Sequence, residues 1–208
     1  MDFYIAALGR SRSTALANWL TSPPDHVVFH EPNFAADRYT RLFRLQLADW
    51  GIPEDQAFDR SWAVKEILGH REMIEKFTPP KVVLCVRNPR DAALSFFEKH
   101  RKQGLLVRYP DEWTTNYLIR ETTNLTALAE GLSVPFTVIR YEDFNPHTLR
   151  SIGDWVGWPG GGETSRGLTS FDRGFELNQN RDRELPRECY RLADEVAERC
   201  NEFIETFY

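Results

Sequence analysis

Short apolar runs alternate along the chain with longer stretches in which apolar residues recur every three or four positions. The first pattern is typical of buried strands and the second of amphipathic helices. The apolar runs predict strands at 3–8, 26–31, 62–65, 81–86 and 134–141. The helical periodicity predicts helices at 13–20, 36–50, 70–77, from 89 onward, 112–130, 147–158 and 186–207. This alternation favours an α/β fold, a parallel β-sheet flanked by helices on both faces.

The run at 81–86 is the clearest of the predicted strands. It is rich in valine and apolar at consecutive positions, as expected for a strand in the middle of a parallel sheet. Pro89 follows at the first position of a helix, and Asp91 lies in its first turn, where both residue types are favoured. With 208 residues in total, we expect a single domain spanning 1–208.

Composition and charge narrow the class of protein. Hydrophobic residues make up 41% of the chain, which is enough for a packed core, and the net charge of −5 argues against a nucleic-acid partner. The N-terminal residues do not resemble a signal peptide, and no apolar stretch has the length of a membrane span. We therefore expect a cytoplasmic protein without a membrane partner.

The three cysteines, Cys85, Cys189 and Cys200, lie within apolar patterns. They show neither a CxxC motif nor the spacing of a Cys/His metal site. We expect them to be buried, reduced thiols, and we expect no metal site.

The polar segment that separates the first predicted strand from the first predicted helix is the most informative part of the chain. Backbone N–H groups converge in such a loop, and the helix N-terminus carries partial positive charge, so the arrangement suits an anionic phosphate. The sequence is not a Walker A motif, because the Gly-Lys-Ser/Thr ending is missing. The predicted phosphate-binding residues are Gly9, Arg10, Ser11, Arg12, Ser13 and Thr14.

A second candidate anion site follows the strand at 81–86. Arg87 ends this strand, and Ser95 lies about two helical turns beyond Pro89. An arginine fork and a hydroxyl in these places suit a second phosphate. The alternative is structural: Arg87 pairs with Glu66 or Asp91 at the edge of the sheet.

Together, segments 8–16 and 86–95 resemble the two cofactor signatures of the sulfotransferases that depend on PAPS (3′-phosphoadenosine-5′-phosphosulfate). The resemblance runs in order over about 2–144 and includes the lysine of 62–65 and the segment 138–143. It implies a sulfotransferase-type, P-loop NTPase-like fold and transfer of a sulfuryl group from PAPS to a hydroxyl or amine, with 3′,5′-phosphoadenosine (PAP) as product.

The resemblance also implies roles for individual residues. Arg10 contacts the phosphosulfate, Ser13 and Thr14 donate to phosphate oxygens, and Lys65 is a second cation near the transferring group. Arg87 and Ser95 hold the 3′-phosphate. No metal is required. The family commonly has glycine where this chain has Arg12, so the chain departs from the pattern there.

Two further assignments follow from the family pattern. A late loop covers the nucleotide in the family, and Arg173-Gly174 or Arg166-Gly167 are the candidates here; an ordinary solvated loop is the alternative. Many relatives use a histidine as base two residues beyond the lysine, but Ile67 stands in that place.

Other members of the resembled family use a glutamate after the second strand, so the resemblance implies a catalytic base at the end of the second predicted strand. Glu31 and His30 are neighbours, and because side chains alternate along a strand, one of the two faces the site. We favour Glu31 over His30. The structural alternative is that Glu31 caps the next helix or pairs with Arg10.

Two other functions fit the predicted fold. One is a phosphotransferase of the nucleotide-kinase type, which needs a loop lysine and carboxylates for magnesium. The other is a nucleotide-binding protein that lacks a base. The acceptor of a sulfotransferase is not specified by the sequence; the chain length favours a small molecule, or the end of a sugar or peptide.

Overall fold

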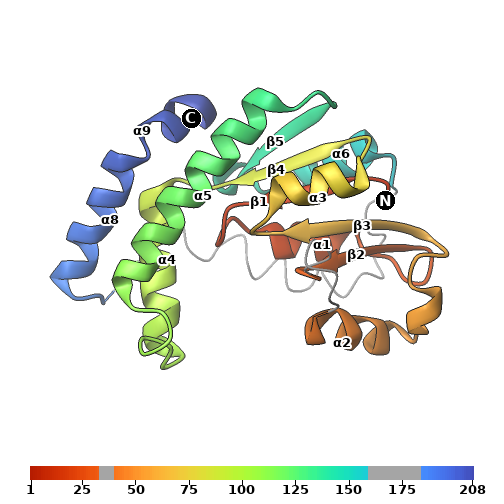
Figure 1. Cartoon of the computed structure of the whole chain (residues 1–208), viewed down its shortest axis with the longest axis horizontal. Helices are drawn as coiled ribbons and strands as arrows, with labels where there is room; N and C mark the ends of the chain where they lie inside the picture. Colours follow the sequence, from red (N-terminus) through yellow and green to blue (C-terminus); the bar gives the residue numbers. More distant parts are fainter. Residues whose placement is uncertain (33–39, 159–183) are drawn as a thin grey trace.

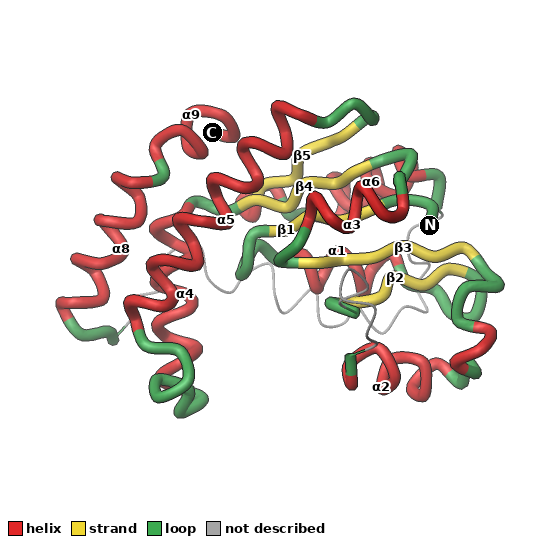
Figure 2. Tube along the Cα trace, in the orientation of Figure 1, coloured by secondary structure: helices red, strands yellow, loops and turns green. Residues whose placement is uncertain are grey.

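The computed structural model describes residues 1–32, 40–158 and 184–208. Within these residues the chain forms a five-stranded, all-parallel sheet in the order β2-β3-β1-β4-β5 (Figures 1 and 2). The strands are β1 (Tyr4–Ala7), β2 (His26–His30), β3 (Ser61–Glu66), β4 (Val82–Val86) and β5 (Phe136–Arg140). β1 lies in the centre between β3 and β4, so the loops that follow these three strands open at one edge of the sheet.

Helices cover both faces of the sheet, as predicted. One face packs against α1 (Ser13–Leu20) and α6 (Pro146–Val156). The opposite face packs against α2 (Arg41–Trp50), α3 (His70–Phe77), α4 (Pro89–Lys102) and α5 (Asp111–Gly131), and α8 (Arg187–Arg199) and α9 (Asn201–Phe207) extend the same core by packing on these helices. Figure 1 shows α8 and α9 outside α4 and α5. Short 3-10 turns occupy η2 (Glu54–Gln56) and η3 (Tyr141–Asp143).

The central strand shows why the sequence pattern is apolar without alternation. Tyr4 and Ala6 enter the core on one face of the sheet, and Phe3, Ile5 and Ala7 enter the core on the other. All five side chains are fully buried. A parallel strand with both faces covered has no solvent side, so a continuous apolar run is the expected pattern.

Two predicted helices differ from the structure, one in where it begins and the other in its continuity. The helix predicted at 36–50 begins at Arg41, because the Thr40 hydroxyl accepts a hydrogen bond from the Phe43 amide at 3.2 Å and caps it; 36–39 lie outside the described residues. The single helix predicted at 186–207 is two helices. Cys200 leaves helical geometry, with its Sγ 3.1 Å from the Thr122 hydroxyl of α5, and this bend keeps α9 against α5.

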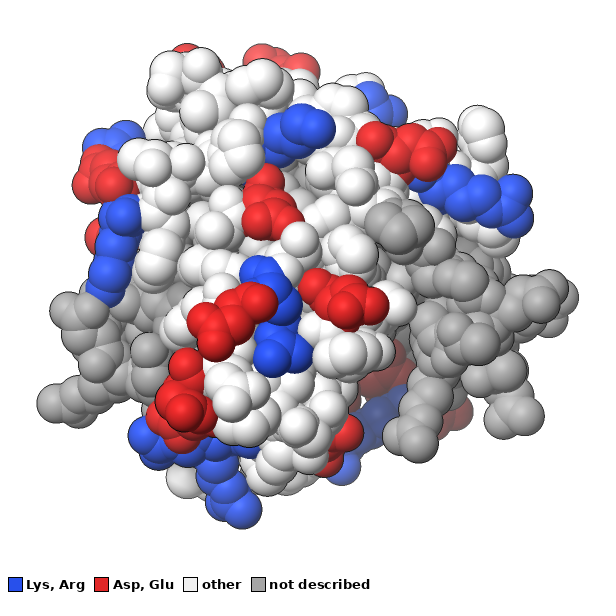
Figure 3. Space-filling view, turned by 90° about the vertical axis from the view of Figure 1, so that its right-hand side faces the viewer, with Lys and Arg blue, Asp and Glu red and all other residues white. Residues whose placement is uncertain are grey.

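The three cysteines are free and buried, as predicted. Burial raises the pKa of the Cys85 thiol, which keeps it protonated. Among the described helices, none combines the length and the apolar character of a membrane span. On the face seen in Figure 3, acidic and basic side chains of the described residues are interspersed.

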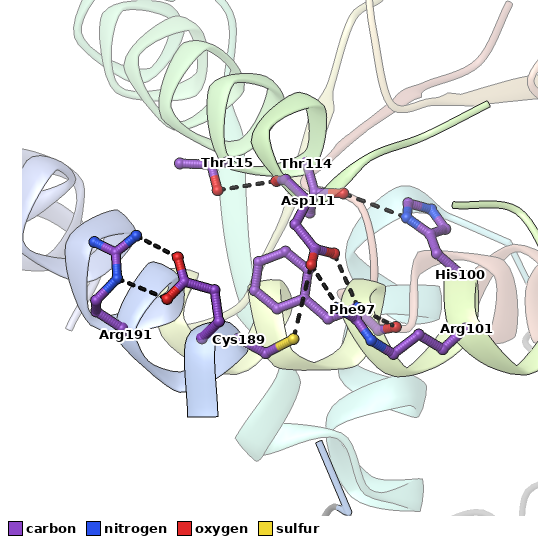
Figure 4. Close-up of polar contacts among 9 residues, drawn as sticks. Phe97, His100, Arg101, Asp111, Thr114, Thr115, Cys189 and Arg191 are labelled. Atoms are coloured by element: carbon purple, nitrogen blue, oxygen red, sulfur yellow. Dashed lines mark hydrogen bonds and ion pairs between the residues drawn. The ribbon is translucent and has the colours of Figure 1, made fainter. Parts of the chain in front are cut away.

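A partly buried ion pair ties the end of α4 to the start of α5 (Figure 4). Arg101 donates from Nη1 to Asp111 Oδ1 at 2.9 Å and from Nη2 to Oδ2 at 2.5 Å. The Cys189 thiol of α8 lies 3.8 Å from the same carboxylate. The hydrogen bond that Arg101 donates to Asp111 raises the pKa of Arg101. Bidentate pairs of this kind fix the geometry of the groups they join, so Asp111 holds three helices in register.

We expect Asp111→Asn to lower the free energy of unfolding by about 1.5–3 kcal/mol, the range for a hydrogen bond to a charged group. The pair between Glu188 and Arg191 is the control, because both side chains are about 60% exposed. Glu188→Gln should change the stability much less than Asp111→Asn, because a solvent-exposed ion pair contributes little. Denaturant unfolding measures both, and equal losses would contradict the anchoring role of Asp111.

Candidate active site

The loop between β1 and α1 has an unusual backbone for its sequence. Arg10 and Arg12 have φ values of 69° and 63°, in the left-handed region that favours glycine. Arg12 is the residue before α1, no side chain caps the helix, and its first turn contains no acidic residue. Amides at the start of a helix without a side-chain cap are groups that can bind an anion, as they do in phosphate-binding loops. Arg12 keeps the backbone conformation that glycine commonly provides in the resembled family.

Gly9 is required by packing rather than by its backbone angles. A Cβ placed on this residue would lie 2.6 Å from the ring of Phe96 and 2.9 Å from the Tyr117 hydroxyl. Real Cβ atoms do not approach neighbours so closely, so a side chain here displaces the loop or the aromatic rings. Gly9 thus allows α4 and α5 to close directly over the loop.

We expect Gly9→Ala to lower the free energy of unfolding by about 1–3 kcal/mol, because it overpacks this contact. Gly131, the last residue of α5, provides a matched control, since a Cβ there meets nothing within 4 Å. Gly131→Ala should therefore cost nothing. Thermal or denaturant unfolding compares the two variants, and similar stabilities would show that the Gly9 contact relaxes freely.

The structure brings the two predicted anion-binding segments into direct contact. Arg10 donates from Nε to the Ser95 hydroxyl at 3.0 Å, and Arg87 donates from Nη1 to the Arg10 carbonyl at 3.1 Å. Arg87 and Ser95 are both buried. Arg87 is thus directed to the β1–α1 loop, and the loop is held against the start of α4.

The ring of Tyr141, the first residue after β5, contacts two of the arginines. The guanidinium carbon of Arg87 lies 3.8 Å from the centre of the Tyr141 ring, and that of Arg12 lies 4.3 Å from it. Cations over an aromatic face are attracted by its quadrupole. Tyr141 lies in the segment 138–143 of the sequence resemblance, but no pattern in that segment indicated that it contacts both arginines.

Glu31 and Lys65 form an ion pair at the carboxyl ends of β2 and β3. The Lys65 ammonium donates to Oε1 of Glu31. Lys65 is 1% exposed, whereas the Glu31 side chain is 40% exposed, so the carboxylate faces solvent while the lysine is enclosed. Glu31 does not serve as the cap of α2, because Thr40 does, and its partner is Lys65 rather than Arg10.

His30 lies next to Glu31 but has a different environment. It is the register partner of Lys65 in the sheet and is buried. Burial, with a smaller contribution from the nearby Lys65 charge, lowers the pKa of His30 to about 3. His30 is therefore neutral and enclosed at neutral pH, and of the two candidate bases Glu31 is the one that reaches solvent.

Lys99 is a cation of this region that sequence reasoning missed. It lies one turn beyond Ser95 on α4 and is partly buried. Burial lowers the pKa of Lys99, the charges of Arg10 and Lys65 lower it further, and Glu31 raises it. The signal in the sequence was the spacing of four from Ser95, which places both side chains on one side of the helix.

The remaining predicted site residues lie either in the β1–α1 loop or outside the described residues. Ser11 and Ser13 are buried in the loop, and Thr14 is exposed. The Ser11 hydroxyl has no hydrogen-bond partner among the described residues. The candidates for a covering loop lie outside the described residues: Arg173, Gly174, Arg166 and Gly167. Within 1–32, 40–158 and 184–208, no group of three metal-ligating side chains occurs.

The fold matches solved sulfotransferases. A sulfotransferase from Alicyclobacillus acidocaldarius is similar with a TM-score of 0.64 at 14% identity, over 99% of this chain and 95% of that chain. Sulfotransferase STF9 from Mycobacterium avium is similar with a TM-score of 0.61 at 14% identity, over 99% of this chain and 76% of that chain. No family model matches the sequence, and no curated protein is significantly similar to it. The chain therefore has the α/β fold of sulfotransferases, as predicted.

Proposed function

We propose that the protein transfers a sulfuryl group from PAPS to a hydroxyl or amine of an acceptor and releases PAP. The observation that carries this proposal is the contact between the two anion-binding segments, in which Arg10 joins Ser95 and Arg87 joins the Arg10 backbone. A ligand with phosphates at both ends of a nucleoside needs two such segments side by side. The sulfotransferase fold supports the same reading.

The donor set suits this ligand. The uncapped N-terminus of α1, together with Arg10, Ser13 and Thr14, would hold the 5′-phosphosulfate. Arg87 and Ser95 would hold the 3′-phosphate. Arg173 and Gly174 remain the candidates for covering the nucleotide. This arrangement places positive charge along the whole donor without the lysine that a Walker A loop uses.

Transfer would then need a base and a cation at the reacting centre. The acceptor oxygen or nitrogen attacks sulfur, the bond between sulfur and the bridging oxygen of the donor breaks, and PAP leaves with that electron pair. Glu31 would take the acceptor proton, because its carboxylate is exposed on one side and held by Lys65 on the other. Lys65 and Arg10 would offset the charge that develops on the bridging oxygen. Lys99 adds a further cation beside them.

The acceptor is proposed to be a small molecule or the end of a sugar or peptide. Of the aromatic residues near the site, Phe97 and Tyr117 are buried in the core. Trp113 is 41% exposed, stacks on Tyr117 with ring centres 5.3 Å apart, and contacts Tyr109. These two surface rings offer an apolar platform next to the site.

Calorimetry with PAP and with ATP tests the proposed donor. We expect PAP to bind without magnesium and more tightly than ATP with magnesium. The reverse preference would favour a phosphotransferase. Incubation with labelled PAPS and a metabolite extract, followed by mass analysis for sulfated products, then tests transfer. Binding of PAP without any sulfated product from a broad acceptor set would favour a nucleotide-binding protein that lacks catalysis.

A further inference from the structure

We propose that Arg12 and Arg87, gathered on the ring of Tyr141, form a two-arginine clamp for the 3′-phosphate of the donor. In this chain Arg12 would thus determine specificity for 3′-phosphorylated nucleotides. The inference rests on the proposed function and adds two residues to it: Arg12 as a specificity-determining contact and Tyr141 as a positioning residue.

The clamp is assembled from three separate segments. Arg12 comes from the β1–α1 loop, Arg87 from the end of β4, and Tyr141 from the start of η3. Tyr141 is 6% exposed, so its ring is fixed by the surrounding core. Both guanidinium carbons lie within 4.3 Å of the ring centre. One rigid ring therefore sets the position of both cations.

Electrostatic interactions favour the binding of a phosphate by these three residues. The quadrupole of the Tyr141 ring attracts both guanidinium groups and holds each of them against the ring. A phosphate dianion that reached both groups would make two charge-assisted, fork-shaped contacts. The ring thus holds the cations ready for a phosphate before the nucleotide arrives, which reduces the ordering cost of binding.

The sheet order indicates which end of the donor the clamp would meet. Glu31 and Lys65 end β2 and β3, which lie on one side of β1. Tyr141 follows β5, which lies beyond β4 on the other side. The contact with Tyr141 thus places the Arg12 guanidinium on the side of Arg87, the residue assigned to the 3′-phosphate, and away from the proposed reacting centre.

The backbone of Arg12 supports a role for its side chain. A φ of 63° strains the backbone of a non-glycine residue, and glycine would adopt it without that strain. Arginine at this position is explained if its guanidinium contributes binding that glycine lacks. The same fact makes Arg12→Gly a suitable test variant, because it fits the existing loop and should fold.

The test compares two ligands that differ only in the 3′-phosphate: PAP and adenosine 5′-monophosphate. We expect Arg12→Gly to weaken PAP binding by about 10- to 100-fold, the equivalent of one hydrogen-bonded charge contact, and to change the affinity for the monophosphate less than about twofold. Tyr141→Leu should show the same selective loss of PAP affinity. Tyr141→Phe keeps the ring and should bind PAP as tightly as the unmodified protein. In turnover, the KM for PAPS should rise while kcat stays unchanged.

Several results would overturn the clamp. Equal weakening of both ligands by Arg12→Gly would place Arg12 at the 5′ end, and no weakening of either would leave it without a binding role. A loss in Tyr141→Phe as large as in Tyr141→Leu would show that the ring does not position the arginines. Failure of the proposed function looks different: the unmodified protein would then show no preference for PAP over the monophosphate.

Discussion

Replacing Glu31 with glutamine is expected to lower turnover by about 10²- to 10⁴-fold, the usual contribution of a general base. Glutamine has nearly the same shape, and its carbonyl oxygen still accepts a hydrogen bond from Lys65, but it cannot take a proton from the acceptor. PAP binding should change little, because Glu31 lies at the end of β2 and away from the residues assigned to the nucleotide. The measurement is initial rate with a good acceptor, paired with calorimetric titration of PAP.

The matched control is Glu54→Gln, which removes a carboxylate from an exposed pair with Arg44 and should leave turnover unchanged. His30→Gln tests the competing base. If that variant loses turnover while Glu31→Gln keeps it, the assignment is reversed. A comparison of unfolding midpoints is needed beside the rates, because Lys65 is buried and a poorly paired charge there would destabilise the fold.

The parts of the fold that the sequence predicted well are those set by local pattern. α1 and α3 have the predicted bounds, since α1 begins after a polar loop and both helices end just before a pair of prolines or its flanking polar residues. β1, β2 and β4 were recognisable because a buried parallel strand is apolar on both faces. Their alternation with helices then implied a parallel sheet with its binding residues at the carboxyl ends of the strands.

The contacts within the site were less accessible to sequence reasoning, because they join residues far apart in the chain. Arg10 and Ser95 are separated by 85 positions, and Glu31 and Lys65 by 34. The pattern placed each of them at a strand end or on a helix, but the partner of each charge depends on loop geometry. Tyr141 was missed because nothing in the pattern distinguishes it from a core tyrosine. Lys99 was missed because its spacing of four from Ser95 also fits an ordinary lysine on the surface of a helix.

The break at Cys200 shows a different limit of sequence reasoning. The apolar side of 186–207 has helical spacing throughout, and neither glycine nor proline interrupts it after 186. The structure bends the chain where Cys200 meets Thr122 of α5, so tertiary packing overrides a continuous local preference.

Two buried histidines make stability depend on pH. Burial, with a contribution from Lys65, lowers the pKa of His30 to about 3 and that of His70 to about 4. Nδ1 of His70 is hydrogen-bonded to the buried Tyr4 hydroxyl at 2.8 Å. In the unfolded chain both imidazoles bind protons below a pH of about 6.5. Between this pH and the folded pKa values the unfolded state holds more protons, so stability rises with pH in this window.

We therefore expect the free energy of unfolding to fall steadily below about pH 6.5, by up to about 1.4 kcal/mol per pH unit for each histidine. His70→Gln should remove one of these contributions down to about pH 4, and His30→Gln the other down to about pH 3. The measurement is denaturant unfolding of each variant between pH 4 and pH 7.5. His147→Gln on α6 is the control, because this side chain is exposed and should leave the slope unchanged. If all three variants kept the slope of the unmodified protein, carboxylates rather than the buried histidines would govern its acid sensitivity.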